Sequence, residues 1–499
     1  MFDLGRLDIT VDEGLERLRS ELATVETVEP LAAPAGFVGD LRTYQAEGLG
    51  WFAFLRRFGF GGCLADDMGL GKTIQVLAML EGRRARPRDP DRPRCSLVVA
   101  PKSLLFNWAA EAARFAPELA VGTYHGPARH RVAFDTHNLV LTTYGTLRRD
   151  RARLKEQRFD YVILDEAQAI KNPRSIAAKA CRELSCDHRL ALSGTPIENH
   201  LGDLASLFDF LNPGMSRCVR AMRALGTTLA PDPEQRRTLA TALRPFVLRR
   251  TKDEVLDDLP SKTEQILHCE LSTRQRREYD ELAVHYRAHL KKKIERDGFA
   301  RSRFNVLEAL LRLRQAACHP GLVHEARRDE DSAKVNLLLS HLDELVAAGH
   351  KALVFSQFTT LLRIVAKRLD ERGHDHAYLD GKTRDRAAAV ERFQTDPTCG
   401  VFLLSLKAGN AGLNLTAADY VFLLDPWWNP AVEAQAIDRA HRIGQTRPVV
   451  AYRLVAKDTV EDSVVALSSQ KRELARDVLG SKARGSSGFD ASDLETLLR

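Results

Sequence analysis

A lysine and a threonine that directly follow a Gly-Leu-Gly sequence form the segment of this chain with the clearest chemical potential. The segment DMGLGKT, residues 67–73, follows the small apolar stretch GGCLA and leads into the helix-like run IQVLAMLEG. In such a loop the glycines let backbone N–H groups face phosphate oxygens, the lysine reaches the β- and γ-phosphates, and the threonine hydroxyl ligates magnesium. The predicted nucleotide site comprises Lys72 and Thr73 with the loop residues Asp66, Asp67, Met68, Gly69, Leu70 and Gly71. Asp66 stands where such loops usually have their first glycine, so a chance glycine turn is the alternative interpretation of this segment taken alone.

Two adjacent acids could supply the other half of a hydrolytic site. Asp165 and Glu166 follow the apolar run YVIL, which is typical of a buried strand. A carboxylate at the end of a strand can hold the hydration shell of a magnesium ion, and its neighbour can orient and deprotonate the attacking water. Adjacent acids are otherwise ordinary solvated surface. Together with Lys72 and with Thr73 as a second magnesium ligand, they predict hydrolysis of a nucleoside triphosphate.

Positive charge for the γ-phosphate could come from the segment QAIDRAHRIGQ in the second half of the chain. The spacing of Gln435, Arg439 and Arg442 predicts that their side chains share one helical face. Arginines presented in this way across a cleft act as arginine fingers, each of which raises the rate of phosphoryl transfer by a factor of about 10³ to 10⁵. An ordinary basic surface helix is the alternative for this motif alone.

Short apolar runs alternate with helix-length segments twice along the chain. The strand-like runs are residues 96–101, 138–144, 161–167 and 188–196 in the first block, and 351–358, 376–381, 401–406 and 420–426 in the second. Such alternation predicts a parallel sheet covered by helices on both faces. Between the blocks the sequence is mainly helical and charged, with one strand-like piece, residues 263–272, inside it.

We therefore predict an α/β protein with two doubly wound parallel-sheet lobes and helical insertions between them. The first lobe spans residues 37–270 and contains a helical insertion near 214–250. A helical protrusion follows at 271–332, and the second lobe spans 333–480. Residues 1–36 form an N-terminal segment, and residues 481–499, which include ARGSSG, form a flexible tail.

The composition is that of a folded protein, because 44% of the 499 residues are hydrophobic and 28% are charged. The formal net charge of +7 fits a phosphate-binding surface but is also common in proteins that touch no nucleic acid. The eight cysteines are scattered without a C-x₂-C pair, which favours reduced structural thiols over a zinc site. No apolar run approaches the roughly 20 residues that span a bilayer. We therefore expect a soluble cytoplasmic protein with no membrane partner.

The order of these motifs, from residue 37 to about 479, resembles the ATPase core of the SWI/SNF-related family within helicase superfamily two. DMGLGKT and DEAQ resemble motifs one and two of that family, LRTYQAEGLGWF resembles its glutamine motif, and AIDRAHRIGQTRPV resembles motif six. The resemblance implies two RecA-like lobes that bind ATP and Mg²⁺ between them. It further implies adenine recognition by Gln45, nucleotide contacts by Gln168 and Gln435, and arginine fingers at Arg439 and Arg442.

Other segments resemble the nucleic-acid and coupling motifs of the same family. APKSLLFNWAAEAARF, LTTYGTL, VFSQF and SLKAGNAGLNLT resemble segments that grip a nucleic-acid backbone, which implies sequence-independent phosphate contacts. The residues concerned are Lys102, Ser103, Thr143, Ser356, Gln357, Lys407 and Asn414. SGTPIEN resembles motif three, in which Ser193, Gly194 and Thr195 would couple hydrolysis to movement. FDFLNPG, PFVLRRTKDEVLDDLP and LRQAACHP resemble blocks that distinguish this family from ordinary helicases.

The chain departs from the family pattern at a few positions. The second motif is DEAQ rather than the commoner DEAH or DEGH, and Gln168 can still donate and accept hydrogen bonds that link the γ-phosphate site to motif three. Asn410 replaces a usual glycine. DEAQ cores resemble those of bacterial members, either HepA/RapA-like or bacterial SWI/SNF helicase C-terminal cores, so we expect a bacterial, nucleoid-associated protein.

The expected function is ATP-dependent translocation on double-stranded DNA by a monomer that displaces or remodels DNA-bound protein. Two alternatives are a strand-separating helicase and an ATP-gated factor that docks on RNA polymerase. Trp427 and Trp428 could stack on bases, although packing is the more common role of tryptophans after a buried strand. His319 and His441 lack partners at metal-ligand spacing, which favours structural roles.

Overall fold

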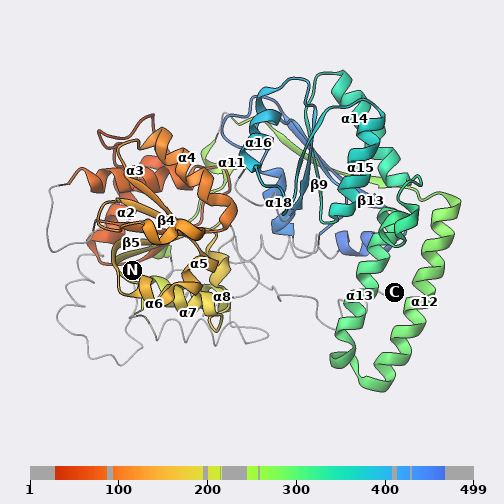
Figure 1. The fold of residues 1–499 in the computed structure, drawn as a ribbon, viewed down its shortest axis with the longest axis horizontal. Helices are drawn as coiled ribbons and strands as arrows, with labels where there is room; N and C mark the ends of the chain where they lie inside the picture. The colour runs from red at the N-terminus through yellow and green to blue at the C-terminus, as the bar shows by residue number, and fades with distance from the viewer. Residues whose placement is uncertain are drawn as a thin grey trace. The chain divides into compact units, whose positions relative to one another are not determined.

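The structure is a computed structural model that describes residues 28–86, 94–194, 201–213, 215, 244–256, 259–406, 413–427 and 430–466. The chain divides between residues 257 and 258 into two compact units. Each unit contains one parallel β-sheet with helices on both faces (Figure 1), which confirms the predicted α/β class with two parallel sheets. The expected tail at 481–499 lies outside the described residues, as do most of the N-terminal segment 1–36 and most of the insertion near 214–250.

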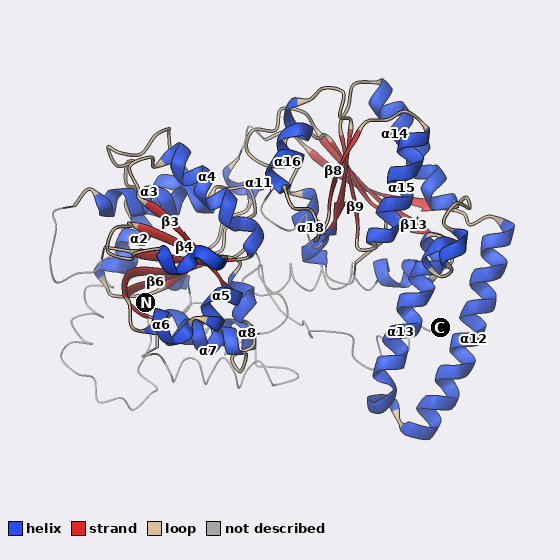
Figure 2. Ribbon diagram, viewed as in Figure 1, coloured by secondary structure: helices blue, strands red, loops and turns tan. Residues whose placement is uncertain are grey.

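Among the described residues, the sheet of the first unit has seven strands, all paired in parallel, in the order β3-β4-β2-β5-β6-β1-β7. Figure 2 shows strands of this sheet, in red, among the helices that cover it. The strands are β1 Gly62–Leu64, β2 Ser96–Ala100, β3 Val121–Tyr124, β4 Leu139–Thr143, β5 Arg158–Leu164, β6 Ser185–Leu192 and β7 Val247–Leu248. The helices are α2 Thr43–Arg57, α3 Lys72–Arg84, α4 Leu105–Phe115, α5 Tyr144–Arg149, α6 Arg151–Lys155, α7 Ile176–Arg182, α8 Leu201–Leu211 and α11 Lys252–Val255.

Side chains of the central strand β2 explain why this sheet is covered on both faces. Leu97 and Val99 pack in one cluster with side chains of α5, α6, α7 and α8, whereas Val98 and Ala100 pack in another with α2, α3 and α4. All four strand residues are fully buried. A strand that buries both faces is a continuous apolar run rather than an alternating one, as the sequence SLVVA shows.

In the described part of the second unit, the sheet has six strands, also paired in parallel, in the order β10-β11-β9-β12-β13-β8. The strands are β8 Lys262–Cys269, β9 Ala352–Ser356, β10 His376–Leu379, β11 Val401–Ser405, β12 Tyr420–Leu423 and β13 Val449–Ala456. The helices are α12 Thr273–Asp297, α13 Phe299–Cys318, α14 Ala333–Ala347, α15 Thr359–Glu371, α16 Arg386–Thr395 and α18 Pro430–Ile437. Helices α14 and α15 pack with Val354 on one face of the sheet, and α16 and α18 pack with Leu353 and Phe355 on the other.

Strand β8 forms an edge of the second sheet, where the sequence did not place it. We expected a strand here inside the helical region and within the first lobe, but β8 pairs with β13 from Lys262 opposite Val449 to Cys269 opposite Ala456. Most of its side chains are exposed or half-buried, so its sequence lacks the apolar run of a central strand. Its partner lies far along the chain, and pairing over such a distance is set by the tertiary fold rather than by local pattern.

The helical region expected at 271–332 contains α12 and α13, two long helices that run side by side away from the second sheet (Figure 1). Their facing side chains, which include Tyr279, Leu290 and Leu310, form a cluster that continues onto Ala456 and Val460 at the end of β13. The hairpin is therefore part of the second unit.

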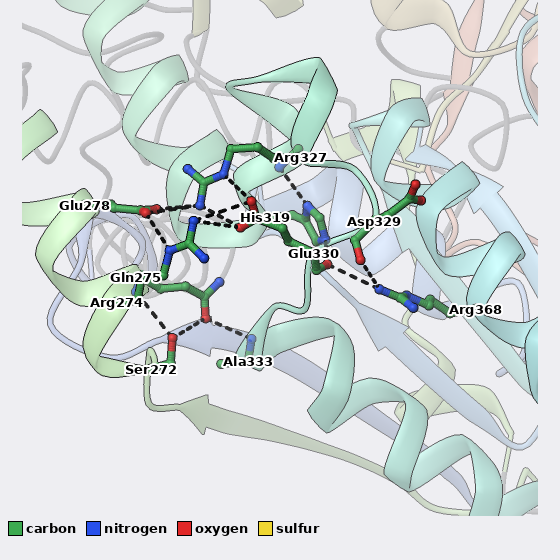
Figure 3. A network of polar contacts seen from close by, with 11 residues as sticks. Ser272, Arg274, Gln275, Glu278, His319, Arg327, Asp329, Glu330, Ala333 and Arg368 are labelled. Atoms are coloured by element: carbon green, nitrogen blue, oxygen red, sulfur yellow. Dashed lines mark hydrogen bonds and ion pairs between the residues drawn. The ribbon is translucent and has the colours of Figure 1, made fainter.

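A network of polar contacts fixes the end of α13 against α12 and α14 (Figure 3). His319, which is fully buried, accepts a hydrogen bond at Nδ1 from the backbone N–H of Gly321 (2.9 Å), and its Nε2 lies 3.0 Å from the carbonyl oxygen of Glu330. Because Nδ1 accepts, Nε2 carries the proton and donates to that carbonyl. Arg327 bonds both Glu330 (2.7 Å) and Glu278 of α12 (3.0 Å). The structural role expected of His319 agrees with these contacts.

The neutral form of His319 is expected to stabilise the second unit in a pH-dependent way. Burial lowers the pKa of His319, the nearby Arg368 and Arg327 act in the same direction, and the hydrogen bond to Glu330 opposes them. A histidine whose pKa is depressed by folding contributes stability above its unfolded pKa of about 6.5 and loses that contribution as the pH falls toward the folded value. At pH 7.5, His319→Gln should therefore cost about 1 to 3 kcal/mol, the usual effect of leaving a buried polar group unpaired.

The difference in thermal midpoint between the wild type and His319→Gln, measured from pH 7.5 down to pH 5, should shrink as the pH falls. The exposed His285 on α12 provides the control, and His285→Gln should leave the midpoint unchanged at every pH. A constant difference between wild type and His319→Gln across this range would contradict the prediction.

The described cysteines are free thiols. Burial raises the pKa of Cys63, Cys95 and Cys181 to about 12, so these thiols stay protonated and unreactive. Cys218 lies outside the described residues. Among the residues that the structure describes, no group of histidine, cysteine and acidic side chains is arranged to hold a metal ion by itself, and no helix is both long and apolar enough to cross a membrane.

Candidate nucleotide site

The glycine-rich loop joins β1 to the N-terminus of α3, as a phosphate-binding loop must. Gly69 and Gly71 have φ angles of 95° and 75°, in the left-handed region that glycine tolerates best. A Cβ atom on Gly71 would lie 2.6 Å from Nε2 of Gln45, so a larger residue would have to displace that side chain. Lys72 and Thr73 occupy the first turn of α3, whose unpaired N–H groups and dipole favour an anion.

The side chain of Lys72 folds back over its own loop. Its Nζ donates to the backbone carbonyls of Asp66 (2.6 Å) and Asp67 (3.3 Å). Both contacts are to neutral acceptors, so a phosphate oxygen could replace them with a stronger, charge-assisted bond.

Asp165 and Glu166 follow β5, and β6 lies between β5 and β1 in the sheet. Asp165 is buried, accepts a hydrogen bond from the indole N–H of Trp108 (2.8 Å), and accepts another from the backbone N–H of Glu166 (2.9 Å). Burial raises the pKa of Asp165 to about 7, and the negative charge of Glu166 adds to this rise while Lys72 opposes it. A divalent cation at this carboxylate would favour its ionised form.

Glu166 has a backbone conformation that is rare for its residue type. Its φ of 49° lies in the left-handed region, which costs free energy for a residue with a Cβ atom and is enriched at functional sites. The turn places the Glu166 carboxylate beside Gln168, whose Nε2 donates to it at 2.6 Å. The strained residue is thus held in one orientation by its neighbour.

Gln168 also connects the acidic pair to the segment after β6. Its side-chain oxygen accepts a hydrogen bond from the hydroxyl of Ser193 (3.3 Å). Gly194 lies close to the phosphate loop, because a Cβ atom built on it would be 3.9 Å from Nζ of Lys72. These contacts form the link between DEAQ and SGT that the resemblance implied. Their role in coupling hydrolysis to movement stays a prediction, and Thr195 lies outside the described residues.

Two residues predicted to touch the nucleotide are engaged in other contacts. Asp66 is fully buried beneath the loop and pairs with Arg250 through Oδ2 (2.6 Å) and Oδ1 (3.0 Å). Gln45 is also buried, donates to the carbonyl of Leu70 (3.2 Å), and accepts from the N–H of Arg42 (3.0 Å). In this arrangement both side chains are engaged in buried contacts that support the loop, and neither is exposed to a ligand.

Two residues of the site were not identified from the sequence. Trp108 occupies a buried position of the amphipathic helix α4, and only the tertiary fold brings its indole N–H to Asp165 at the end of β5. Arg250 belongs to the block PFVLRRTKDEV, far from the loop in sequence. A buried arginine needs partners for its charge and its N–H groups, but sequence alone does not say which residues supply them.

Arg439 and Arg442 lie after helix α18 rather than on one helical face with Gln435. Helix α18 ends at Ile437, so the predicted alignment of Arg439 and Arg442 with Gln435 is wrong. After Ile437 the backbone N–H groups of Arg439 and Ala440 donate to carbonyls three residues back, which is the spacing of a turn and not of an α-helix. The carbonyl of Arg439 accepts from the N–H of Leu415 (3.0 Å), and the side chain of Gln445 donates to the carbonyl of Ala440 (3.1 Å).

The two arginines differ in exposure. Arg439 is only 1% exposed, whereas Arg442 is half-buried and donates to the carbonyl of Leu413 (3.2 Å). Gln435, on α18, is also half-buried. Arg442 is therefore the arginine of this segment that is open to a ligand, and Arg439 is part of the core of the second unit.

The residues expected to bind the nucleic-acid backbone differ in their exposure. Lys102 and Asn414 are exposed and Ser103 is half-buried, so their side chains are open to a ligand. Thr143 instead caps α5, because its hydroxyl accepts from the N–H of Thr146 (3.0 Å). Lys407 lies outside the described residues.

Ser356 is buried, which argues against a direct phosphate contact by its side chain. Its hydroxyl donates to Asp425 (2.5 Å), and the backbone N–H of Gln357 donates to the same carboxylate (3.2 Å). Arg314 of α13 pairs with Asp425 (3.5 Å) and lies over the ring of Trp427, 5.7 Å from its centroid. These contacts favour packing over base stacking for Trp427, and Trp428 lies outside the described residues.

Most of the chain matches two families of known domains. Residues 44–322 match the SNF2-related domain, and residues 333–444 match the helicase conserved C-terminal domain. The uncharacterized ATP-dependent helicase MG018 of Mycoplasma genitalium is 37% identical over 89% of this chain, and the putative ATP-dependent helicase/translocase YwqA of Bacillus subtilis is 35% identical over 95% of it. The TATA-binding protein-associated factor MOT1 of Saccharomyces cerevisiae is 32% identical over 93% of the chain.

The chain spans 42% of the length of the Mycoplasma relative, 53% of the Bacillus relative and 29% of the yeast relative. Among solved structures, the Sulfolobus solfataricus SWI2/SNF2 ATPase core in complex with dsDNA is 33% identical, with 91% of this chain and 96% of that chain covered and a TM-score of 0.46. The family match covers both halves of the helicase-like core. The chain therefore belongs to the SNF2-related family.

Proposed function

We propose that the chain is an ATP-driven translocase on double-stranded DNA that remodels or displaces DNA-bound protein without obligatory strand separation. Within this proposal, hydrolysis takes place at the phosphate loop and the acidic pair of the first unit. Lys102, Ser103 and Asn414 contribute to a sequence-independent grip on the DNA backbone. The name of the Bacillus relative, a helicase/translocase, supports movement along nucleic acid as the output.

The observation that carries the proposal is the set of contacts at the ends of three adjacent strands. The phosphate loop follows β1, the Ser193 segment follows β6 and the acidic pair follows β5, and these strands are neighbours in the sheet. Gln168 bonds both Glu166 and Ser193, and Gly194 lies beside the amine of Lys72. Ligands of open α/β sheets bind at this edge, outside the carboxyl ends of the strands.

The residues at this edge fit a magnesium nucleotide. Thr73 and Asp165 offer the hard oxygen ligands that Mg²⁺ prefers, and the ion needs only one or two protein ligands when phosphates and water supply the rest. Bound magnesium would neutralise charge on the phosphates. Lys72 would leave the Asp66 and Asp67 carbonyls to bind the β- and γ-phosphates, while Glu166 would orient and deprotonate the attacking water.

The decisive experiment is ATP hydrolysis measured with no nucleic acid, duplex DNA, single-stranded DNA and RNA. We expect strong stimulation by duplex DNA, weakened by added salt because phosphate contacts release counterions. Lys72→Ala should abolish the stimulated rate, because the amine that binds the phosphates is lost. The exposed Lys367 on α15, whose Nζ bonds Asp329 (2.6 Å), provides the control, and Lys367→Ala should retain full activity.

Each alternative function predicts a different result. Stimulation by RNA or single strands, together with displacement of a labelled strand, would indicate a strand-separating helicase. Co-purification with RNA polymerase and weak stimulation by naked DNA would indicate a polymerase-associated factor. Equal, low rates under every condition would overturn the proposed translocase.

A further inference from the structure

The last segment of the first unit runs directly alongside the phosphate loop. Strand β7 pairs in parallel with β1, which places Leu248 opposite Leu64. The contact continues past the strands, because the N–H of Ala65 donates to the carbonyl of Leu248 (2.7 Å) and the N–H of Asp67 donates to the carbonyl of Arg250 (2.9 Å). The first residues of the phosphate loop therefore form backbone hydrogen bonds with residues 248–250, a segment that lies far away in the chain.

Side chains extend this contact to the interior of the loop. The guanidinium of Arg250 bonds both carboxylate oxygens of Asp66, at 3.0 and 2.6 Å, and the side-chain oxygen of Gln75 at 3.0 Å. Gln75 returns a hydrogen bond from its Nε2 to Asp66 (3.1 Å). Asp66 and Gln75 are fully buried and Arg250 nearly so. A buried pair of charges persists only with such complete pairing, since a lone buried charge is very costly.

The same guanidinium also reaches the helix before the loop. Arg250 donates to the backbone carbonyl of Tyr44 on α2 and lies over the Tyr44 ring, 5.1 Å from its centroid. The hydroxyl of Tyr44 in turn donates to the carbonyl of Leu70 in the loop (3.0 Å). One side chain thus joins α2, the loop and, through Gln75, helix α3.

We propose that Arg250 is a positioning residue that holds the phosphate loop in its nucleotide-binding shape, with Asp66 as its partner. The proposal rests on the ATP-binding function of the loop proposed above. Asp66 stands where such loops usually have their first glycine, and its ion pair with Arg250 holds the backbone of the loop at this point. Arg250 does not touch the nucleotide. It acts through the backbone that presents Lys72 and Thr73 to the phosphates.

A side chain that only stabilises the fold would leave nucleotide affinity unchanged, so the test compares affinity with stability. Equilibrium binding of ATP and thermal unfolding would be measured for wild type, Arg250→Met and Arg250→Lys. Partners that orient a binding group are worth about tenfold to a hundredfold in affinity at metal sites, so we expect Arg250→Met to raise the Kd for ATP at least about tenfold. Lysine restores the charge but not the bidentate hydrogen bonds to Asp66, so Arg250→Lys should recover part of the affinity for ATP.

Arg83 offers a matched control on the same helix. It pairs with Asp160 through two short hydrogen bonds, from Nε and one terminal nitrogen, and lies in the last turn of α3, at the end opposite the loop. Arg83→Met should lower the unfolding midpoint while leaving the Kd for ATP unchanged. Arg250→Met should change both.

A double-mutant cycle with Asp66→Asn tests the pairing itself. If the two residues act as a unit, Arg250→Met combined with Asp66→Asn should weaken ATP binding no more than the worse single change, whereas independent effects would multiply. A Kd for ATP within about twofold of wild type, in Arg250→Met or, should that variant fail to fold, in Arg250→Lys, would overturn the proposal, since that is the range of unrelated surface substitutions.

A failure of the proposal for Arg250 can be distinguished from a failure of the translocase proposal. ATP binding to the wild type is measured without hydrolysis or DNA, so a protein that binds ATP but is not stimulated by DNA still tests Arg250. A wild type that binds no ATP would overturn both.

Discussion

Replacing Glu166 with glutamine is expected to leave ATP binding intact and to lower hydrolysis by about 10²- to 10⁴-fold, the usual contribution of a general base. Glutamine keeps the size and the hydrogen bond with Gln168 but cannot take a proton from water. The position of Glu166 at the end of β5, its left-handed φ of 49° and its 2.6 Å bond to Gln168 all hold the carboxylate in one orientation. Single-turnover hydrolysis and equilibrium binding of ATP would be measured side by side.

Glu183 provides the matched control for this substitution. It is another glutamate of the first unit, at the end of α7, and it pairs with Arg151 near the surface. Glu183→Gln should hydrolyse ATP at the wild-type rate. Hydrolysis by Glu166→Gln within a factor of about three of wild type would exclude Glu166 as the base, because general-base catalysis is worth far more than that.

The second large effect is expected at Arg442. If this arginine supplies positive charge to the γ-phosphate, Arg442→Ala should lower the rate of hydrolysis by about 10³- to 10⁵-fold. Arg442 is half-buried with one terminal nitrogen on the carbonyl of Leu413, so its side chain can exchange that neutral acceptor for a phosphate oxygen. ATP binding should weaken much less than hydrolysis, because the added charge matters most in the transition state.

Two neighbouring arginines separate this effect from a loss of structure. Arg439 is 1% exposed, so Arg439→Ala should lower the thermal midpoint of the protein. Arg447 is exposed and pairs with Asp419 at 3.3 Å, so Arg447→Ala should change neither hydrolysis nor stability appreciably. Full hydrolysis by a folded Arg442→Ala protein would show that the finger lies elsewhere.

The sequence by itself determined the α/β class and the two parallel sheets, and it predicted the main residues of the candidate nucleotide site. Each of these has a local signal. A strand buried on both faces is a continuous apolar run, as in SLVVA of β2, and a phosphate loop needs its glycines, lysine and threonine in one short segment. The link from Gln168 to Ser193 also followed, because both residues belong to recognisable motifs after adjacent strands.

The tertiary structure alone decided the contacts between segments that are far apart in sequence. Strand β8 joins the second sheet through β13, Arg250 reaches Asp66, and Trp108 donates to Asp165. It also ended α18 at Ile437, because the next residues form turns and the carbonyl of Arg439 accepts from Leu415 of another segment. Local patterns report which side chains must be buried. They do not report which distant partner satisfies a buried charge or N–H group, since that depends on how the helices pack on the sheet.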